Sequence, residues 1–230
     1  MSKYSEYRAN EPMVLERHPA LRPDYDHLIE DHDSHFNLVK ALCGTNGPHN
    51  TTPLFQCDFV LLSVLNRSLD LLDGFIWSFN RWNLSTAAPT VRMQVDNLLR
   101  VALLFKAGPV AAEVLLSGRP LGKERDPLAS PGKKNTLTDQ RLREHARDRF
   151  PWLDLVYEKS SGWIHFSSVH IWVTMEITDE GQISGRFPSD ISRYPFEFLE
   201  QVLWAMRKST AGVLDIATEF ADGKRHALSD

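Results

Sequence analysis

The sequence contains very few of the residues and patterns that mark disulfide-rich, zinc-bound and membrane proteins. Cysteine occurs only twice in 230 residues, as Cys43 and Cys57, which is too few for a disulfide framework or a cysteine-based zinc site and leaves room for one bridge at most. Charged residues interrupt every apolar run before it reaches the length of a membrane span. The first residues, Met1-Ser-Lys-Tyr-Ser-Glu, lack the apolar core of a signal peptide. We therefore expect a cytoplasmic protein that does not associate with a membrane.

The common catalytic signatures are missing as well. No glycine-rich phosphate loop follows a predicted strand, no Gly-x-Ser-x-Gly elbow occurs, and no cysteine pair has the spacing of metal ligands. His27, Asp31 and His35 lie four residues apart, so on a helix they would present two imidazoles and a carboxylate on one face, as in a metal-dependent hydrolase. Other acidic residues surround them, which is more typical of a solvated acidic face. We expect neither a metal nor another cofactor.

What is present is the composition of an ordinary globular domain. Hydrophobic residues make up 42% of the chain and charged residues 24%, which is enough apolar surface for one core. Residues 1–22 mix charge and proline without periodicity. We therefore expect a loose N-terminal arm over residues 1–22 and a single helical domain over residues 23–230.

Apolar residues at helical spacing account for most of that domain. Helices are predicted over residues 23–43, 54–82, 90–107, 111–116, 138–149 and 151–165, with a last long helix over residues 194–221. Gly108-Pro109 is predicted to end the third of them, and Gly223 to lie beyond the end of the last. Alternating apolar residues around a turn predict a β-hairpin over residues 171–187. The expected fold is mainly α, a helical bundle with a small β-hairpin inserted before the last long helix.

A row of polar residues is the strongest functional signal. Tyr157, Ser161 and His165 lie four residues apart, so they would form one polar stripe on an otherwise aromatic helix. Either the stripe is a buried hydrogen-bond ladder, or His165 handles a proton in a site. Arg92 and Asp96, one turn apart, would face this stripe if their helix packed antiparallel to it; otherwise they are an exposed ion pair.

Positive charge is concentrated in one segment of an acidic chain. Residues 119–149 hold nine lysines and arginines against five acidic residues, a net charge of +4, which leaves −8 for the rest of the chain. Such a segment is able to contact phosphates, although charge runs usually form solvated loops and helix faces. The candidate nucleic-acid contacts within it are Lys123, Arg125, Lys133, Lys134, Arg141 and Arg143.

The order of these features resembles a known superfamily. A helix with an arginine and an acidic residue one turn later, a helix with Tyr157-x3-Ser161-x3-His165, a hairpin and a long terminal helix are similar to uncharacterised bacterial HEPN proteins related to abortive-infection proteins. The resemblance covers roughly residues 55–220. Active members are metal-independent ribonucleases whose site is an arginine, a polar residue and a histidine four to six residues after the arginine, commonly assembled across a homodimer.

The sequence departs from that pattern in the helix where the motif belongs. The one match, Arg22-Pro-Asp-Tyr-Asp-His27, has a proline where a polar residue is expected. The resemblance implies an RNA-directed protein of antiviral defence or of a toxin–antitoxin pair, in which His165 is the general acid/base and Arg92 stabilises charge on the phosphate. The alternative is a non-catalytic module, built on the basic segment, that recognises a nucleotide, a nucleic acid or a protein.

Overall fold

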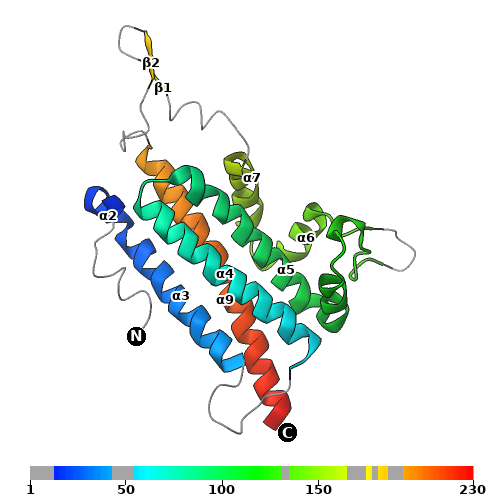
Figure 1. The fold of residues 1–230 in the computed structure, drawn as a ribbon. Helices are drawn as coiled ribbons and strands as arrows, with labels where there is room; N and C mark the ends of the chain where they lie inside the picture. The colour runs from blue at the N-terminus through cyan, green and yellow to red at the C-terminus, as the bar shows by residue number, and fades with distance from the viewer. Residues whose placement is uncertain are drawn as a thin grey trace.

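The computed structural model confirms a mainly α-helical bundle with a small hairpin ahead of the last long helix (Figure 1). It describes residues 13–42, 54–130, 135–164, 175–177, 181–185 and 194–229. The helices are α2 (Met13–Arg17), α3 (Arg22–Leu42), α4 (Gln56–Asn80), α5 (Leu84–Leu116), α6 (Asp139–Ala146), α7 (Leu153–Ile164) and α9 (Phe196–Ser229), with short 3-10 turns η1 (Pro19–Leu21) and η2 (Leu121–Lys123). Within these described residues, no helix combines the length and apolarity that crossing a membrane requires.

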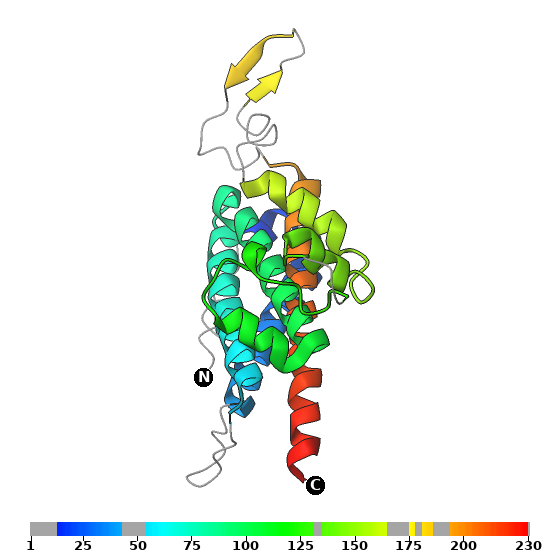
Figure 2. The same ribbon diagram turned by 90° about the vertical axis from the view of Figure 1, so that its right-hand side faces the viewer.

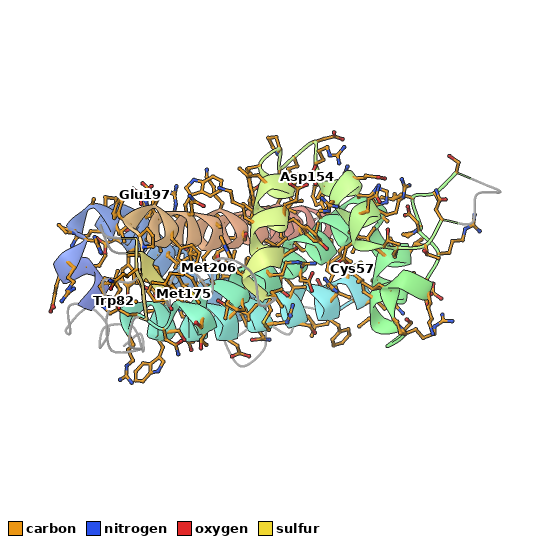
Figure 3. The ribbon with its side chains drawn as sticks, turned by 90° about the horizontal axis from the view of Figure 1, so that it is seen from above. Cys57, Trp82, Asp154, Met175, Glu197 and Met206 are labelled. Atoms are coloured by element: carbon orange, nitrogen blue, oxygen red, sulfur yellow. The ribbon has the colours of Figure 1, made fainter. Side chains whose placement is uncertain are left out.

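Four long helices form the body of the bundle. α3, α4, the first half of α5 and α9 lie side by side, and α4 and α9 both pack on α5 (Figures 1 and 2). Seen from above, α4 runs the length of the bundle from Cys57 near one end to Trp82 just beyond the other (Figure 3). Its inward face carries large residues at helical spacing that are fully buried, namely Leu61, Leu65, Leu72, Phe75, Ile76 and Phe79. Burial of this stripe contributes to the stability of the fold, together with the buried faces of α5 and α9.

The turn between α4 and α5 explains why α5 begins at Leu84 and not at Thr90. Trp82 adopts a left-handed conformation with φ of 60°, and the next amide, Asn83 N–H, donates to the Ser78 carbonyl over 2.9 Å. These are the features of a Schellman motif, which reverses the chain immediately and lets the next helix start at once. Pro89 does not interrupt that helix, because the carbonyl it leaves without a partner belongs to the exposed residue Ser85.

The predicted break at Gly108-Pro109 is a kink inside α5. Gly108 has φ of 53° and ψ of −130°, which is outside the helical region, and the helix resumes directly after it. The second half of α5 therefore turns across the long helices instead of continuing alongside them (Figure 2). This turn brings Leu115 and Leu116 back toward α4.

Several other boundaries differ from the expectations. Part of the expected loose arm is folded, because α2 and η1 bury Val14, Leu15 and Leu21. α9 continues through Gly223 to Ser229, because one glycine of low helix propensity does not by itself end a long helix. The hairpin consists of β1 (Met175–Ile177) and β2 (Ile183–Gly185), paired antiparallel with Met175 opposite Gly185, and stands apart from the bundle (Figure 1).

Candidate functional site

Three of the predicted catalytic residues do meet where α5, α6 and α7 come together. The Arg92 guanidinium donates to the carboxylate of Asp96 on its own helix and, over 2.8 Å, to that of Asp139 on α6. The Tyr157 hydroxyl of α7 donates to the same Asp139 carboxylate over 2.7 Å. Arg92 also lies over the Tyr157 ring, 4.0 Å from its centroid. The contact predicted between the helices of Arg92 and Tyr157 is therefore formed.

Within this cluster the Arg92 guanidinium is already paired with carboxylates. The Arg92 side chain is buried, 11% exposed, and holds two carboxylates. Burial alone would lower the pKa of Arg92, but the hydrogen bond and charge of Asp96 outweigh it, and the pKa is raised. Burial, followed by the hydrogen bond to Asp139, also raises the pKa of Tyr157, so the phenol stays protonated. The group ties three helices together and leaves Arg92 little capacity for a phosphate.

Ser161 and His165 are the other two residues of the polar stripe. The Ser161 hydroxyl donates to the Tyr157 carbonyl one turn earlier, over 2.8 Å, so the predicted side-chain ladder does not form between these two residues. α7 ends at Ile164, and His165 lies outside the described residues. Trp163, near that end, contacts Phe198 at the start of α9, with ring centroids 5.9 Å apart.

The basic segment is largely neutralised by its own neighbours. Arg141 pairs with Asp126 over 3.1 Å and with Glu144. Arg143 pairs with Asp154 of α7 over 2.9 Å. Two of the predicted nucleic-acid contacts, Lys123 and Arg125, are exposed and form no ion pair with any described residue. Two others, Lys133 and Lys134, lie outside the part of the chain that the structure describes.

His27, Asp31 and His35 do not share one metal-binding face on α3. His27 is exposed, whereas His35 is fully buried. Both ring nitrogens of His35 have protein partners, because Nδ1 lies 2.8 Å from the Asp31 carbonyl and Nε2 lies 3.1 Å from the Ser68 hydroxyl. Across the described ranges no cluster of His, Cys, Asp and Glu side chains is suited to a metal ion. The structure therefore gives no support to a metal-dependent hydrolase at this place.

A pocket of about 510 Å³ opens on the side of the bundle where α5 folds back over α4. The kink at Gly108 creates it, because the second half of α5 and the segment after it form a wall facing the first half. Both aliphatic and polar side chains line the pocket. The lining residues are Val60, Ser63, Val64, Arg67, Asp96, Asn97, Arg100, Leu115, Leu116, Arg119, Pro120 and Leu121.

Three arginines from three parts of the chain converge on this pocket. Arg67 of α4 donates to the Asn97 side-chain oxygen over 2.5 Å and to the Met93 carbonyl over 3.3 Å, and no described carboxylate forms an ion pair with it. Burial lowers the pKa of Arg67, with the charge of Asp96 opposing, and the group stays cationic because an arginine titrates far above neutrality.

The other two arginines share their charge with acids. Arg100 lies 3.4 Å from the Asp96 carboxylate, which also holds Arg92, and Arg119 pairs with Glu124 over 2.8 Å. Counting only the lining side chains, three arginines against Asp96 give the pocket a net charge of +2. The arrangement is suited to an anion, because arginine forks donate to the paired oxygens of phosphates and carboxylates.

Neither Arg67 nor Arg100 was identified as a site residue from the sequence, although the sequence around Arg67 holds a signal that could have identified it. Arg67 is the single basic residue between Gln56 and Asn80, on a helix whose other charged residues are Asp58, Asp70 and Asp73. A lone cation on a largely buried helix points either to an ion pair or to a site. Comparisons of the chain with protein-family models, with curated proteins and with solved structures gave no match.

Proposed function

We propose that this protein is a binding module for a phosphate-bearing ligand, either a free nucleotide or the phosphate end of an RNA, held in the pocket between α4 and the two halves of α5. The observation that carries the proposal is Arg67, a half-buried guanidinium directed at the pocket and without a described carboxylate partner. Arg100 and Arg119 line the same pocket.

The charge of the pocket fits this ligand class. A phosphate monoester carries about −1.5 to −2 at neutral pH and offers three strong acceptor oxygens. The positive lining charge complements such an anion, although Glu124 offsets the charge of Arg119 by pairing with it. Desolvated, pre-oriented arginines also make stronger charge-assisted hydrogen bonds than exposed ones.

The rest of the lining favours binding over chemistry. None of the described residues that line the pocket is a histidine, cysteine or lysine, and the hydroxyl of its serine, Ser63, donates to the Phe59 carbonyl of its own helix over 2.8 Å. Among the described lining residues, Asp96 is the group able to act as a general base, and its carboxylate is already paired with Arg92 and Arg100. Val60, Val64, Leu115 and Leu116 give the ligand body an aliphatic wall without groups that select a base by hydrogen bonds.

The test compares Arg67 of α4 with Arg81, the residue that directly follows α4. AMP, inorganic phosphate and a short RNA with either a 5′-phosphate or a 5′-hydroxyl are titrated against the protein by calorimetry or fluorescence anisotropy. We expect binding that requires the phosphate, and Arg67→Gln weakens it by about 10- to 100-fold, the equivalent of one or two charge-assisted hydrogen bonds. Arg81→Gln removes the same charge from a site outside the pocket, where Arg81 lies 3.6 Å over the Trp77 ring, and leaves the affinity nearly unchanged.

Two results would reject the proposal. Equal weakening by Arg67→Gln and Arg81→Gln would mean that only the overall charge attracts the ligand. Failure of the wild-type protein to bind any of the phosphate probes would mean that the pocket is not a phosphate site. Preference between AMP and the phosphorylated RNA identifies which of the two sources supplies the phosphate.

Metal-independent RNA cleavage is a second candidate function. The observation that favours it is the meeting of Arg92, Asp96 and Tyr157, which was one of the two alternatives that the spacing of these residues left open. Against it stands the saturation of Arg92 by two carboxylates. Asp96 belongs both to the cluster around Arg92 and to the pocket, since it pairs with Arg92 and also lines the pocket.

A further inference from the structure

A chain of buried hydrogen bonds crosses the bundle and ends at the pocket. It starts at Arg67, whose Nη1 donates to the Asn97 side-chain oxygen over 2.5 Å. The Asn97 amide donates to the Gln94 side-chain oxygen over 3.1 Å, and the Gln94 amide donates to the Ser68 hydroxyl over 2.6 Å. The Ser68 hydroxyl lies 3.1 Å from Nε2 of His35 on α3. Four of these residues, His35, Ser68, Gln94 and Asn97, are at most 1% exposed.

All donors in the chain point the same way. Nδ1 of His35 lies 2.8 Å from the Asp31 carbonyl, which can only accept, so Nδ1 carries the hydrogen. In the neutral ring Nε2 then accepts the hydrogen of Ser68, and Ser68 is free to accept from Gln94. Burial lowers the pKa of His35 to about 4, so the ring is neutral near pH 7. Each group therefore has one consistent role, from the Arg67 cation inward to the Asp31 carbonyl.

We infer that Asn97, Gln94, Ser68 and His35 are positioning residues that hold the Arg67 guanidinium in place for the phosphate-bearing ligand. The inference rests on the proposed function of the pocket. Asn97 lines the pocket itself, but Gln94, Ser68 and His35 do not, so they act through Arg67. The neutral amide of Asn97 matters, because it fixes Arg67 without neutralising it, as a carboxylate in that position would.

The physical gain is pre-organisation. An arginine side chain loses rotamer freedom when it binds a ligand, and a site that fixes the side chain beforehand removes that cost from binding. Among the described residues, the acceptors of Arg67 are the Asn97 side-chain oxygen and the Met93 carbonyl, and both bind Nη1, so Nη2 and Nε are left for the ligand. Chains of hydrogen bonds in a low-dielectric interior also strengthen one another, which stiffens the array.

The test removes the centre of the chain without touching the pocket lining. Gln94→Met keeps the approximate size of the side chain but removes its bonds to Ser68, Asn97 and Thr210. We expect AMP to bind about 3- to 10-fold more weakly, because Asn97 is no longer fixed and Arg67 regains freedom. Ser68→Ala interrupts the same chain one step further in and serves as a second variant if Gln94→Met does not fold.

A matched control separates positioning from lost stability. Ser209→Ala also deletes a buried polar group of the core, but the Ser209 hydroxyl donates only to the Ala205 carbonyl of its own helix, over 2.8 Å. It is expected to lower the free energy of unfolding and to leave AMP affinity unchanged. A second readout needs no ligand, because nitrogen-15 NMR of the arginine side chains reports whether rotation of the Arg67 guanidinium is restricted. The restriction is expected in wild type and Ser209→Ala, and lost in Gln94→Met and Ser68→Ala.

The outcomes distinguish the two proposals. If Gln94→Met and Ser68→Ala keep both the affinity and the restricted Arg67 signal while Arg67→Gln loses binding, the positioning role is overturned and the phosphate site stands. If Ser209→Ala weakens binding as much as Gln94→Met does, the effect is one of stability and the positioning role is again overturned. If wild-type protein binds neither AMP nor inorganic phosphate, the proposed function fails and the positioning role fails with it.

Discussion

Replacing Gly108 with alanine should show how far the kink in α5 controls the fold and the pocket. Gly108 has φ of 53° and ψ of −130°, a conformation that side chains with a Cβ rarely adopt. An added Cβ meets no atom within 4 Å, so a clash with neighbours contributes nothing. The whole effect of Gly108→Ala is therefore backbone strain, about 1 to 3 kcal/mol for a residue held in a disfavoured region.

The expected change is measurable in two assays. A loss of about 2 kcal/mol in the free energy of unfolding corresponds to a fall of roughly 4 to 8 °C in Tm for a domain of this size. Denaturant unfolding gives the same quantity as a shift in midpoint at constant m. If the strain is relieved by movement of the second half of α5, Leu115, Leu116 and Arg119 shift, and AMP binding weakens as well.

Gly74→Ala in the interior of α4 is the matched control. Its Cβ likewise meets nothing within 4 Å, but its backbone is helical and its φ is not in the positive region. Alanine should stabilise α4 there by roughly 0.5 to 1 kcal/mol through helix propensity. The reasoning is refuted if Gly108→Ala is as stable as wild type, or if the two alanine variants change stability in the same direction.

Two further predictions concern pH and RNA cleavage. Burial raises the pKa of Asp31 to about 6 and lowers the pKa of His35 to about 4. Between about pH 4 and 6, the raised pKa of Asp31 makes the free energy of unfolding fall as pH rises, whereas the lowered pKa of His35 makes it rise. Asp31→Asn removes the falling contribution, so urea unfolding should show stability rising more steeply with pH than in wild type; an equal or shallower slope contradicts this. If the protein cleaves RNA, His165→Ala should slow cleavage by about 10²-fold or more while binding survives. Full cleavage by that variant, verified free of contaminating nuclease, discards His165, and no cleavage by wild type discards the nuclease function.

The helices were predictable because their apolar residues repeat at the spacing of a buried stripe. α3 and α4 fall within two residues of their predicted boundaries, and the hairpin is of the predicted type. The predicted start of α5 was wrong because the start depends on the left-handed conformation of Trp82. Tryptophan rarely adopts that conformation, so the residue type does not indicate it. The end of α9 was wrong because a single glycine lowers helix propensity by only about 1 kcal/mol and does not by itself end a long helix.

Neither the pocket nor its hydrogen-bond chain could be predicted from local sequence patterns. The pocket requires α5 to fold back across α4, which Gly108 permits but does not direct. The buried chain takes its members from α3, α4 and α5, so no single helix displays a polar stripe. Buried polar residues that satisfy one another across helices leave only isolated exceptions in each apolar pattern, as Ser68 does in α4.

The comparison of Arg92 with Arg67 explains why the strongest sequence signal did not mark the best binding site. Both are arginines on the long helices of the bundle, and both are partly or fully removed from water. Arg92 meets two carboxylates and an aromatic ring, so binding a phosphate there would require those interactions to break. Arg67 meets an amide and a carbonyl oxygen, which orient the guanidinium but leave its charge unopposed. A ligand anion gains most where a desolvated cation is fixed but not neutralised, and among the arginines that line the pocket Arg67 meets that condition.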